Sequence, residues 1–203
     1  FSSVWEADSN VKRRMSRLHN AVQVNGRHLA LSIPEHLKLD TFGQANDAFI
    51  KVGTEIGARA VEKALLPHGL EVTDVDAIFF TTVTGLATPT IDARLVNRLG
   101  FRPDVKRTPL FGLGCVGGAA GVARMSDYLR AFPSHCAILI SVELCSLTLQ
   151  LKDLSIPNLI SSGLFGDGAA CVVGVGAQRS QAPAGVRVLD TRSTFFPDTQ
   201  RVM

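Results

Sequence analysis

Paired cysteines are missing from the 203-residue sequence, and their absence excludes two kinds of site. The four cysteines (Cys115, Cys136, Cys145 and Cys171) form no C-x-x-C pair, so neither a zinc site nor a disulfide framework is indicated. Free thiols are typical of a reducing compartment. We therefore expect a cytoplasmic protein without a bound metal.

A large excess of one charge and long apolar runs are missing as well. The formal net charge of +3 is too small to indicate a nucleic-acid partner. No run of 18 apolar residues occurs, and no charged segment followed by an apolar core opens the chain. We therefore expect neither a membrane span nor a secretory signal. The hydrophobic content of 46% fits one sizeable globular core.

Predicted strands and helices alternate along the chain. Apolar residues at helical spacing predict helices over residues 41–66, 90–99, 119–132 and 156–162, and the polar residues 1–20 predict a short helix or an arm. Short apolar runs predict strands over residues 28–33, 75–83, 108–111, 137–142, 169–175 and 186–195, with a loop at 178–185. This alternation is typical of an α/β fold with a parallel or mixed sheet covered on both faces.

Cys115 lies in a glycine-rich stretch, FGLGCVGGAAG, between a predicted strand and a predicted helix. The free N–H groups and the dipole of a helix N-terminus stabilise a thiolate, and flanking glycines let a substrate approach the backbone closely. We therefore interpret Cys115 as a candidate nucleophile. The alternative is a buried cysteine that serves only as a small hydrophobic residue.

The same stretch also matches the dinucleotide-binding pattern G-x-G-x-x-G at Gly112, Gly114 and Gly117. The match is weak because it does not lie at the first strand-to-helix turn of the chain. An acidic residue that binds a ribose is expected about 20 residues further on, and none stands there.

Two polar segments follow predicted strands, and a third begins one. The sequence TTVTG occupies residues 81–85 and VELCSLT occupies residues 142–148, whereas LFGDGAA at residues 164–170 begins a strand. Ligands of open α/β sheets bind beyond the carboxyl ends of the strands. We therefore expect the first two segments to lie near Cys115.

Taken together, four motifs resemble the type III polyketide synthases, the chalcone-synthase-like family. They are GCVGG at 114–118, VELCS at 142–146, LFGDGA at 164–169 and GFRPDVKR at 100–107. The resemblance runs from about Val11 to Phe196, and Cys145 makes the chain more similar to the bacterial enzymes than to the plant ones. It implies a thiolase-like fold of two similar halves, with residues 1–203 as the N-terminal domain and the C-terminal half outside this chain.

The resemblance also implies an activity. An acyl-CoA starter would be loaded onto Cys115 and extended by decarboxylative condensation with malonyl-CoA. The poly-β-keto chain would then cyclise to a pyrone or a resorcinol-type product. No metal or redox cofactor is implied, since coenzyme A thioesters are the substrates, and the family's enzymes are homodimers.

Several residues match positions that shape the family's active-site cavity. Phe165 matches the gatekeeper phenylalanine between the coenzyme A tunnel and the cavity. Cys145 and Thr148 match cavity-lining positions. Thr82 or Thr84 matches a further cavity threonine, because one extra residue in this loop leaves two alignments open.

Other matches lie outside the cavity. Thr88 falls near the loop residue that reaches across the dimer into the partner's cavity, and Glu143 resembles a buried structural acid. The basic residues Lys12, Arg13 and Arg14 match a stretch that contacts coenzyme A, although a solvated helix face is the alternative. Asp8 stands where the family has one of its coenzyme A-contacting lysines.

The family's catalytic histidine and asparagine have no match in this sequence. After Cys115 the chain contains one histidine, His135, which we expect at the surface, and one asparagine, Asn158, which we expect in a turn or at a helix start. Two alternatives therefore stay open. One is a β-ketoacyl-carrier-protein synthase of the initiation type on the same fold, and the other is a non-catalytic binding subunit that keeps the fold.

Overall fold

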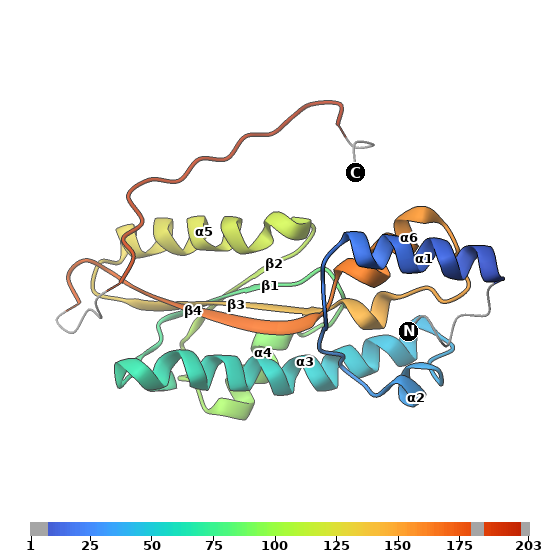
Figure 1. Ribbon diagram of the computed structural model, residues 1–203. Coiled ribbons are helices and arrows are strands. Elements are labelled where there is room, and N and C mark those ends of the chain that lie inside the picture. The colour runs from blue at the N-terminus through green and yellow to red at the C-terminus, as the bar shows by residue number, and fades with distance from the viewer. Residues whose placement is uncertain (1–7, 180–184, 200–203) are drawn as a thin grey trace.

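A four-stranded mixed sheet forms the centre of the computed structural model, which describes residues 8–179 and 185–199 (Figure 1). The strand order is β2-β1-β3-β4, with the first three strands parallel and β4 antiparallel to β3. The strands are β1 (Ala77–Thr81), β2 (Lys106–Leu110), β3 (Cys136–Leu144) and β4 (Asp167–Val175). This mixed α/β sheet confirms the expected fold class.

Helices cover both faces of the sheet (Figure 1). One face carries α5 (Gly117–Ala131), and the other carries α3 (Phe42–Leu65) and α4 (Ile91–Leu99). Beyond the sheet, α1 (Ser9–Ala21) packs beside α6 (Ile156–Leu164), and the short α2 (Ile33–His36) precedes α3. Single 3₁₀ turns complete the described chain: η1 (Leu66–His68), η2 (Val72–Asp74), η3 (Gly114–Val116) and η4 (Cys145–Thr148). Within the described residues no helix is both long and apolar enough to cross a membrane.

The main core lies between the sheet and α3. All five residues of β1 are buried, as expected for a central strand covered on both faces. Phe49 of α3 and Phe80 of β1 are fully buried there, and each buried phenylalanine stabilises the fold by roughly 1.5–3 kcal/mol. The continuous apolar run that predicted this strand therefore reflects burial of both of its faces.

Capping residues fix the ends of the long helices. The Thr41 hydroxyl accepts a hydrogen bond from the Gln44 N–H, and the Gln44 side chain accepts one from the Thr41 N–H, so α3 begins immediately after Thr41. Helix α4 ends at Gly100, whose φ of +75° is the left-handed conformation that favours glycine. Both boundaries confirm the sequence-based prediction.

The strand predicted over residues 28–33 is wrong. This segment makes isolated hydrogen bonds to the start of β4, in which the Asp167 N–H donates to the His28 carbonyl over 3.1 Å. The chain then enters α2, because Ser32 and Glu35 form a capping box at its N-terminus. The local capping interactions therefore prevail over the β-propensity of the apolar residues.

The strand predicted over residues 186–195 is wrong as well. Residues 185–199 run along the α5 side of the molecule without joining the sheet (Figure 1). Val186 is 99% exposed, and the Leu189 carbonyl accepts a hydrogen bond from the Arg130 side chain over 2.7 Å. An alternating apolar pattern becomes a strand only when a sheet edge pairs with it, and in the described structure this segment lies beside a helix instead. The loop expected at 178–185 falls largely outside the described residues.

At the amino ends of the strands, Asp76 joins three segments. Its Oδ2 accepts the Cys136 N–H over 2.8 Å, and its Oδ1 accepts the Arg102 guanidinium over 2.9 Å. Burial acts to raise the pKa of the Asp76 carboxyl, but the hydrogen bonds from Arg102 and Cys136 outweigh burial, and the pKa is lowered. Asp76 is therefore a stabilising carboxylate.

We predict that Asp76→Ala lowers the free energy of unfolding by about 2 kcal/mol at neutral pH, because it leaves the Cys136 N–H and the guanidinium without this acceptor. The carboxylate contributes stability above its unfolded pKa of about 4, and this contribution is lost as the pH falls through the lower folded value. Urea unfolding of both proteins across this range should show the gap narrowing with acid. A gap that is independent of pH would contradict the assignment.

Candidate active site

A cavity of about 670 Å³ opens at the carboxyl ends of β1 and β3. Thr81, the last residue of β1, pairs with Ser141 of β3, and β3 continues beyond this point to Leu144. Seven of the residues named from the sequence line this cavity: Thr84, Cys115, Glu143, Cys145, Thr148, Asn158 and Phe165. The segments that follow the two strands therefore meet Cys115 at one edge of the sheet, as expected.

Cys115 lies in η3, immediately before the start of α5. The chain turns from β2 into η3 through Gly112 and Gly114, whose φ angles of +82° and +55° favour glycine. The Cys115 side chain is exposed, which excludes the alternative of a buried cysteine that serves only in packing. The thiol thus stands at a helix N-terminus and borders the cavity.

A close contact between α5 and the sheet holds Cys115 in this place. A Cβ atom added to Gly117 would collide with the Thr81 hydroxyl, and one added to Gly121 would lie 2.5 Å from a methyl group of Leu139. Larger residues at these positions would push the helix away from β1 and β3. Gly117 and Gly121 are therefore needed for packing, a role that the sequence pattern alone does not indicate.

Two neighbouring glycines provide a matched test of this contact. We predict that Gly117→Ala destabilises the protein by about 1–3 kcal/mol, because the added methyl group overpacks the helix against Thr81. Gly118 has open space within 4 Å of the position of an added Cβ. Gly118→Ala should therefore raise stability by up to about 1 kcal/mol through its higher helix propensity. Equal effects of the two variants in chemical denaturation would contradict the packing role of Gly117.

The Glu143 carboxylate forms the inner wall of the cavity and is held by the loop after β1. Its two oxygens accept the Val83 N–H over 3.1 and 3.2 Å, and Oε2 accepts the Thr84 hydroxyl over 2.7 Å. The Thr84 oxygen in turn accepts the Leu144 N–H over 2.8 Å. These bonds fit the structural role expected for Glu143 and also leave its carboxylate at the cavity surface.

The two candidate threonines are placed differently. Thr84 lines the Cys115 cavity, whereas Thr82 is 6% exposed and lines a separate cavity of about 200 Å³ beside Phe49 and Leu86. Thr84 therefore lies at the Cys115 cavity, whereas the match of either threonine to the family's cavity position stays a prediction.

The three other cysteines differ from Cys115 in their surroundings. Burial raises the pKa of Cys145 to about 11, with further contributions from Glu143 and Asp167. Burial likewise raises the pKa of Cys136 to about 11 and that of Cys171 to about 12. All three are therefore protonated thiols at neutral pH, and Cys145 presents a neutral surface to the cavity.

We predict that iodoacetamide modifies Cys115 at least about tenfold faster than any other cysteine at pH 7.5, because thiolates react and buried thiols of high pKa do not ionise. Peptide mass spectrometry after brief labelling measures the four rates separately. Raising the pH toward 10 should increase the labelling of Cys145. Labelling of Cys145 or Cys171 as fast as that of Cys115 at pH 7.5 would contradict this arrangement.

Phe165 lies at the end of α6 and is 45% exposed beside the cavity. The guanidinium of Arg27 donates hydrogen bonds to the carbonyls of Ser162 and Gly163 in the last turn of α6. Arg27 thereby fixes the segment that carries Phe165, and it lines the same cavity. No local pattern singled out Arg27, because its partners lie 135 and 136 residues away.

Asn158 also lines the cavity, at the third position of α6, which confirms its expected place at a helix start. Its side-chain amide donates to the carbonyls of Gln150 and Asp153 over 2.8 and 2.7 Å. These bonds order the loop between η4 and α6. The side-chain amide of Asn158 is therefore hydrogen-bonded within this loop.

The basic residues of α1 and Thr88 lie away from the cavity. Lys12, Arg13 and Arg14 are exposed on α1, and Thr88 is exposed in the loop after β1. None of them lines the cavity in the described structure. Asp8 caps the N-terminus of α1, where its Oδ1 accepts the N–H groups of Asn10 and Val11, which gives the acid a structural reason.

His135 lies just before β3, at the opposite end of the sheet from Cys115. It is half-buried, not fully at the surface as expected, since its Nδ1 is 2.7 Å from the Tyr128 hydroxyl and its ring stacks on Phe132. Its position excludes a direct contact between His135 and the Cys115 cavity.

Comparisons with known proteins bear on this site. The family model described as "Chalcone and stilbene synthases, N-terminal domain" matches residues 3–179. A 1,3,6,8-tetrahydroxynaphthalene synthase from Streptomyces peucetius subsp. caesius is 49% identical over 93% of this chain and 50% of its own length. A putative chalcone synthase from Bacillus subtilis (strain 168) is 36% identical over 96% of this chain and 55% of its own length.

The known structures agree with these sequence matches. The crystal structure of 1,3,6,8-tetrahydroxynaphthalene synthase from Streptomyces coelicolor A3(2), a bacterial type III polyketide synthase, superimposes with a TM-score of 0.87 at 30% identity. The superposition covers 98% of this chain and 56% of that one. The chain thus spans about half the length of the relatives that it matches.

Proposed function

This chain belongs to the chalcone and stilbene synthase family of type III polyketide synthases, and from that premise we propose that Cys115 accepts an acyl group from coenzyme A. The protein that carries the chain would then extend this acyl group with malonyl-CoA. The observation that carries the proposal is the exposed Cys115 thiol at the N-terminus of α5, on a cavity at the carboxyl edge of the sheet.

The proposed loading step is a transthioesterification. The Cys115 thiolate attacks the carbonyl carbon of acyl-CoA, a new S–C bond forms, and the S–C bond to coenzyme A breaks with release of its thiol. Free N–H groups at the start of α5 favour the anionic thiolate. In the extension step, malonyl-CoA loses carbon dioxide, and the resulting carbanion attacks the Cys115 thioester and displaces the thiolate. Metal or redox cofactors have no part in either step.

The cavity lining supports a reactive acyl chain as the ligand. Leu149, Cys145 and Phe165 supply uncharged wall, and Arg27, Thr84, Glu143 and Asn158 are among the residues that add polar groups. An apolar pocket with few polar groups is typical of sites that bind and orient small molecules. We propose that such a chain, once extended, cyclises here to a pyrone or a resorcinol-type product.

The coenzyme A moiety would bind on the side of α1. Met15 of α1 and Leu159 of α6 share a small buried cluster, so α1 is anchored on the helix that ends at Phe165. The exposed Lys12, Arg13 and Arg14 do not line the cavity, but they lie on the helix that packs against α6, and we propose that they offer positive charge to the coenzyme A phosphates. Phe165 would stand between this surface and the cavity.

The quaternary structure and the compartment are part of the same proposal. Thr88 lies in an exposed loop together with Val83 and Leu86, which are 41% and 50% exposed. Such a loop suits contact with a second copy, and we propose a homodimer in which Thr88 reaches the partner's cavity. The four free cysteines fit a reducing cytoplasm.

Intact-mass measurement after incubation with an acyl-CoA tests the central step. We predict that the protein gains one acyl group and that Cys115→Ala abolishes this gain. Cys171→Ala is the matched control, because Cys171 is a poorly ionising thiol in β4 that lines none of the cavities described here. This control variant should be acylated like the wild type.

Acylation that persists in Cys115→Ala would refute the assignment of the nucleophile. Absence of acylation in the wild-type protein, at acyl-CoA concentrations well above the protein concentration, would favour the non-catalytic binding subunit. Extension of the acyl group only by malonyl groups bound to a carrier protein would favour the initiation-type synthase.

A further inference from the structure

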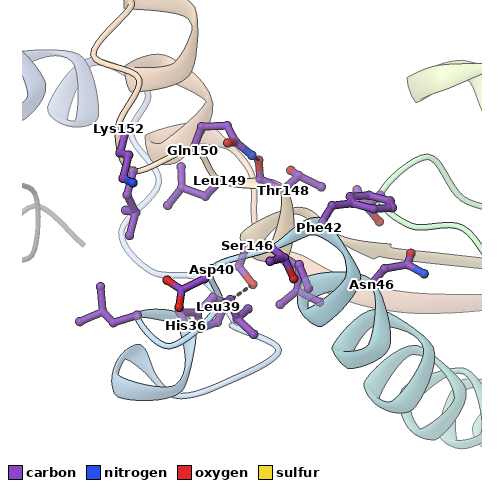
Figure 2. Close-up of a pocket in the computed structure, with 16 residues that line it drawn as sticks. His36, Leu39, Asp40, Phe42, Asn46, Ser146, Thr148, Leu149, Gln150 and Lys152 are labelled. Atoms are coloured by element: carbon purple, nitrogen blue, oxygen red, sulfur yellow. Dashed lines mark hydrogen bonds between the residues drawn. The ribbon is translucent and has the colours of Figure 1, made fainter.

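A second cavity, of about 610 Å³, lies beside the Cys115 cavity. It is bounded by the loop that follows η4 on one side and by α2 and the start of α3 on the other (Figure 2). Leu39, Phe42 and Leu149 supply apolar surface among polar lining residues that include Asp40, Gln150 and Lys152, and Phe42 is 69% exposed. An aliphatic chain would therefore bury apolar surface in this space.

The two cavities adjoin, and we define the wall between them as the residues that line both. Their shared lining residues are Thr84, Ser146, Thr148 and Leu149. Ser146 and Thr148 belong to η4, whose first residue, Cys145, lines the Cys115 cavity and whose third, Leu147, lines the second cavity. Residues of η4 thus lie between the Cys115 cavity and the second cavity.

A part-buried polar network fixes η4. The Ser146 N–H donates to Oδ1 of Asp167 over 2.8 Å, and the Ser146 hydroxyl donates to Oδ2 of the same carboxylate. On its other side, the Ser146 oxygen is hydrogen-bonded to Nε2 of His36 over 2.8 Å, as Figure 2 shows. His36 is 7% exposed, and Asp167 also accepts the Ala30 N–H.

These contacts join four segments that are distant in the sequence: the chain before α2, α2 itself, η4 and the start of β4. Hydrogen bonds to a carboxylate are stronger than neutral ones and require defined geometry. Ser146 is bonded to His36 of α2 on one side and to Asp167 of β4 on the other, and these two contacts fix its position in the wall.

We propose that His36, Ser146 and Asp167 are positioning residues that determine the length of the chain that Cys115 can carry, because they hold η4 closed between the two cavities. The nature of that chain, an acyl group, rests on the proposed function. Without the network, η4 is released and a longer chain on Cys115 extends into the second cavity. The network would then select short starters and limit the number of extensions.

The rate of Cys115 alkylation by N-methyl-, N-butyl- and N-octylmaleimide tests this proposal. The thiolate adds to the maleimide double bond and a proton from water ends on the neighbouring carbon, so the probe needs no catalysis and no leaving group. We predict that the octyl-to-methyl rate ratio rises at least about threefold in Ser146→Ala and in His36→Leu. The double variant should show no further rise, because both changes break one network.

Two further variants serve as controls. Ser155→Ala removes a Ser–Asp hydrogen bond of 3.0 Å to Asp153, outside both cavities, and should leave the ratio unchanged. His36→Gln keeps a hydrogen-bonding group and should restore a ratio near that of the wild type. Thermal unfolding identifies variants that fail to fold. If Ser146→Ala fails to fold, the comparison of His36→Leu with His36→Gln tests the proposal.

An unchanged ratio in folded Ser146→Ala or folded His36→Leu would overturn the proposal, as would additive rises in the double variant. Equal rises in His36→Gln and His36→Leu would also overturn it, because the hydrogen bond would then be irrelevant. A rise in protein that no acyl-CoA acylates would support the wall while refuting the proposed function, so the two failures are distinguishable.

Discussion

The close approach of α5 to the sheet is the constraint on which the site depends. Gly117 lies against Thr81 at the carboxyl end of β1, and Gly121 lies against Leu139 of β3. Because side chains are absent at these two points, the first turn of the helix comes down onto the strand ends. Cys115, two residues before Gly117, is thereby placed on the same cavity as Glu143, which β3 supplies.

The two ends of the sheet serve different purposes. At the amino end, Asp76 forms an ion pair with Arg102 and accepts a part-buried hydrogen bond from the first residue of β3, Cys136, and both contacts stabilise the fold. At the carboxyl end, polar groups face a cavity and the thiol of Cys115 is exposed, while the neighbouring Cys145 stays protonated because burial raises its pKa. Cys115 is therefore the one exposed thiol among the four cysteines, and its proposed role as nucleophile rests on this difference.

The features of the fold that depend on local sequence patterns could be predicted from the sequence. The core helix α3, the strand β1 and the turn at Cys115 follow from periodicity, capping and glycine placement. Residues 28–33 were misread because capping by Ser32 and isolated bonds to β4 override an apolar run. No sequence pattern indicates the roles of Arg27 and His36, because their hydrogen-bond partners are 135 and 110 residues distant and come close only in the folded chain. Likewise, only the folded loop shows that Thr84 borders the Cys115 cavity and that Thr82 lines another one.

A crystal structure of the protein with an alkyl or acyl chain on Cys115 tests the central claim most directly, namely that the thiol, Glu143, η4 and Phe165 form one substrate cavity. The account predicts that the chain lies inside the cavity, against Cys145 and between Glu143 and Phe165. A chain that points to solvent, away from Cys145 and Phe165, would contradict it.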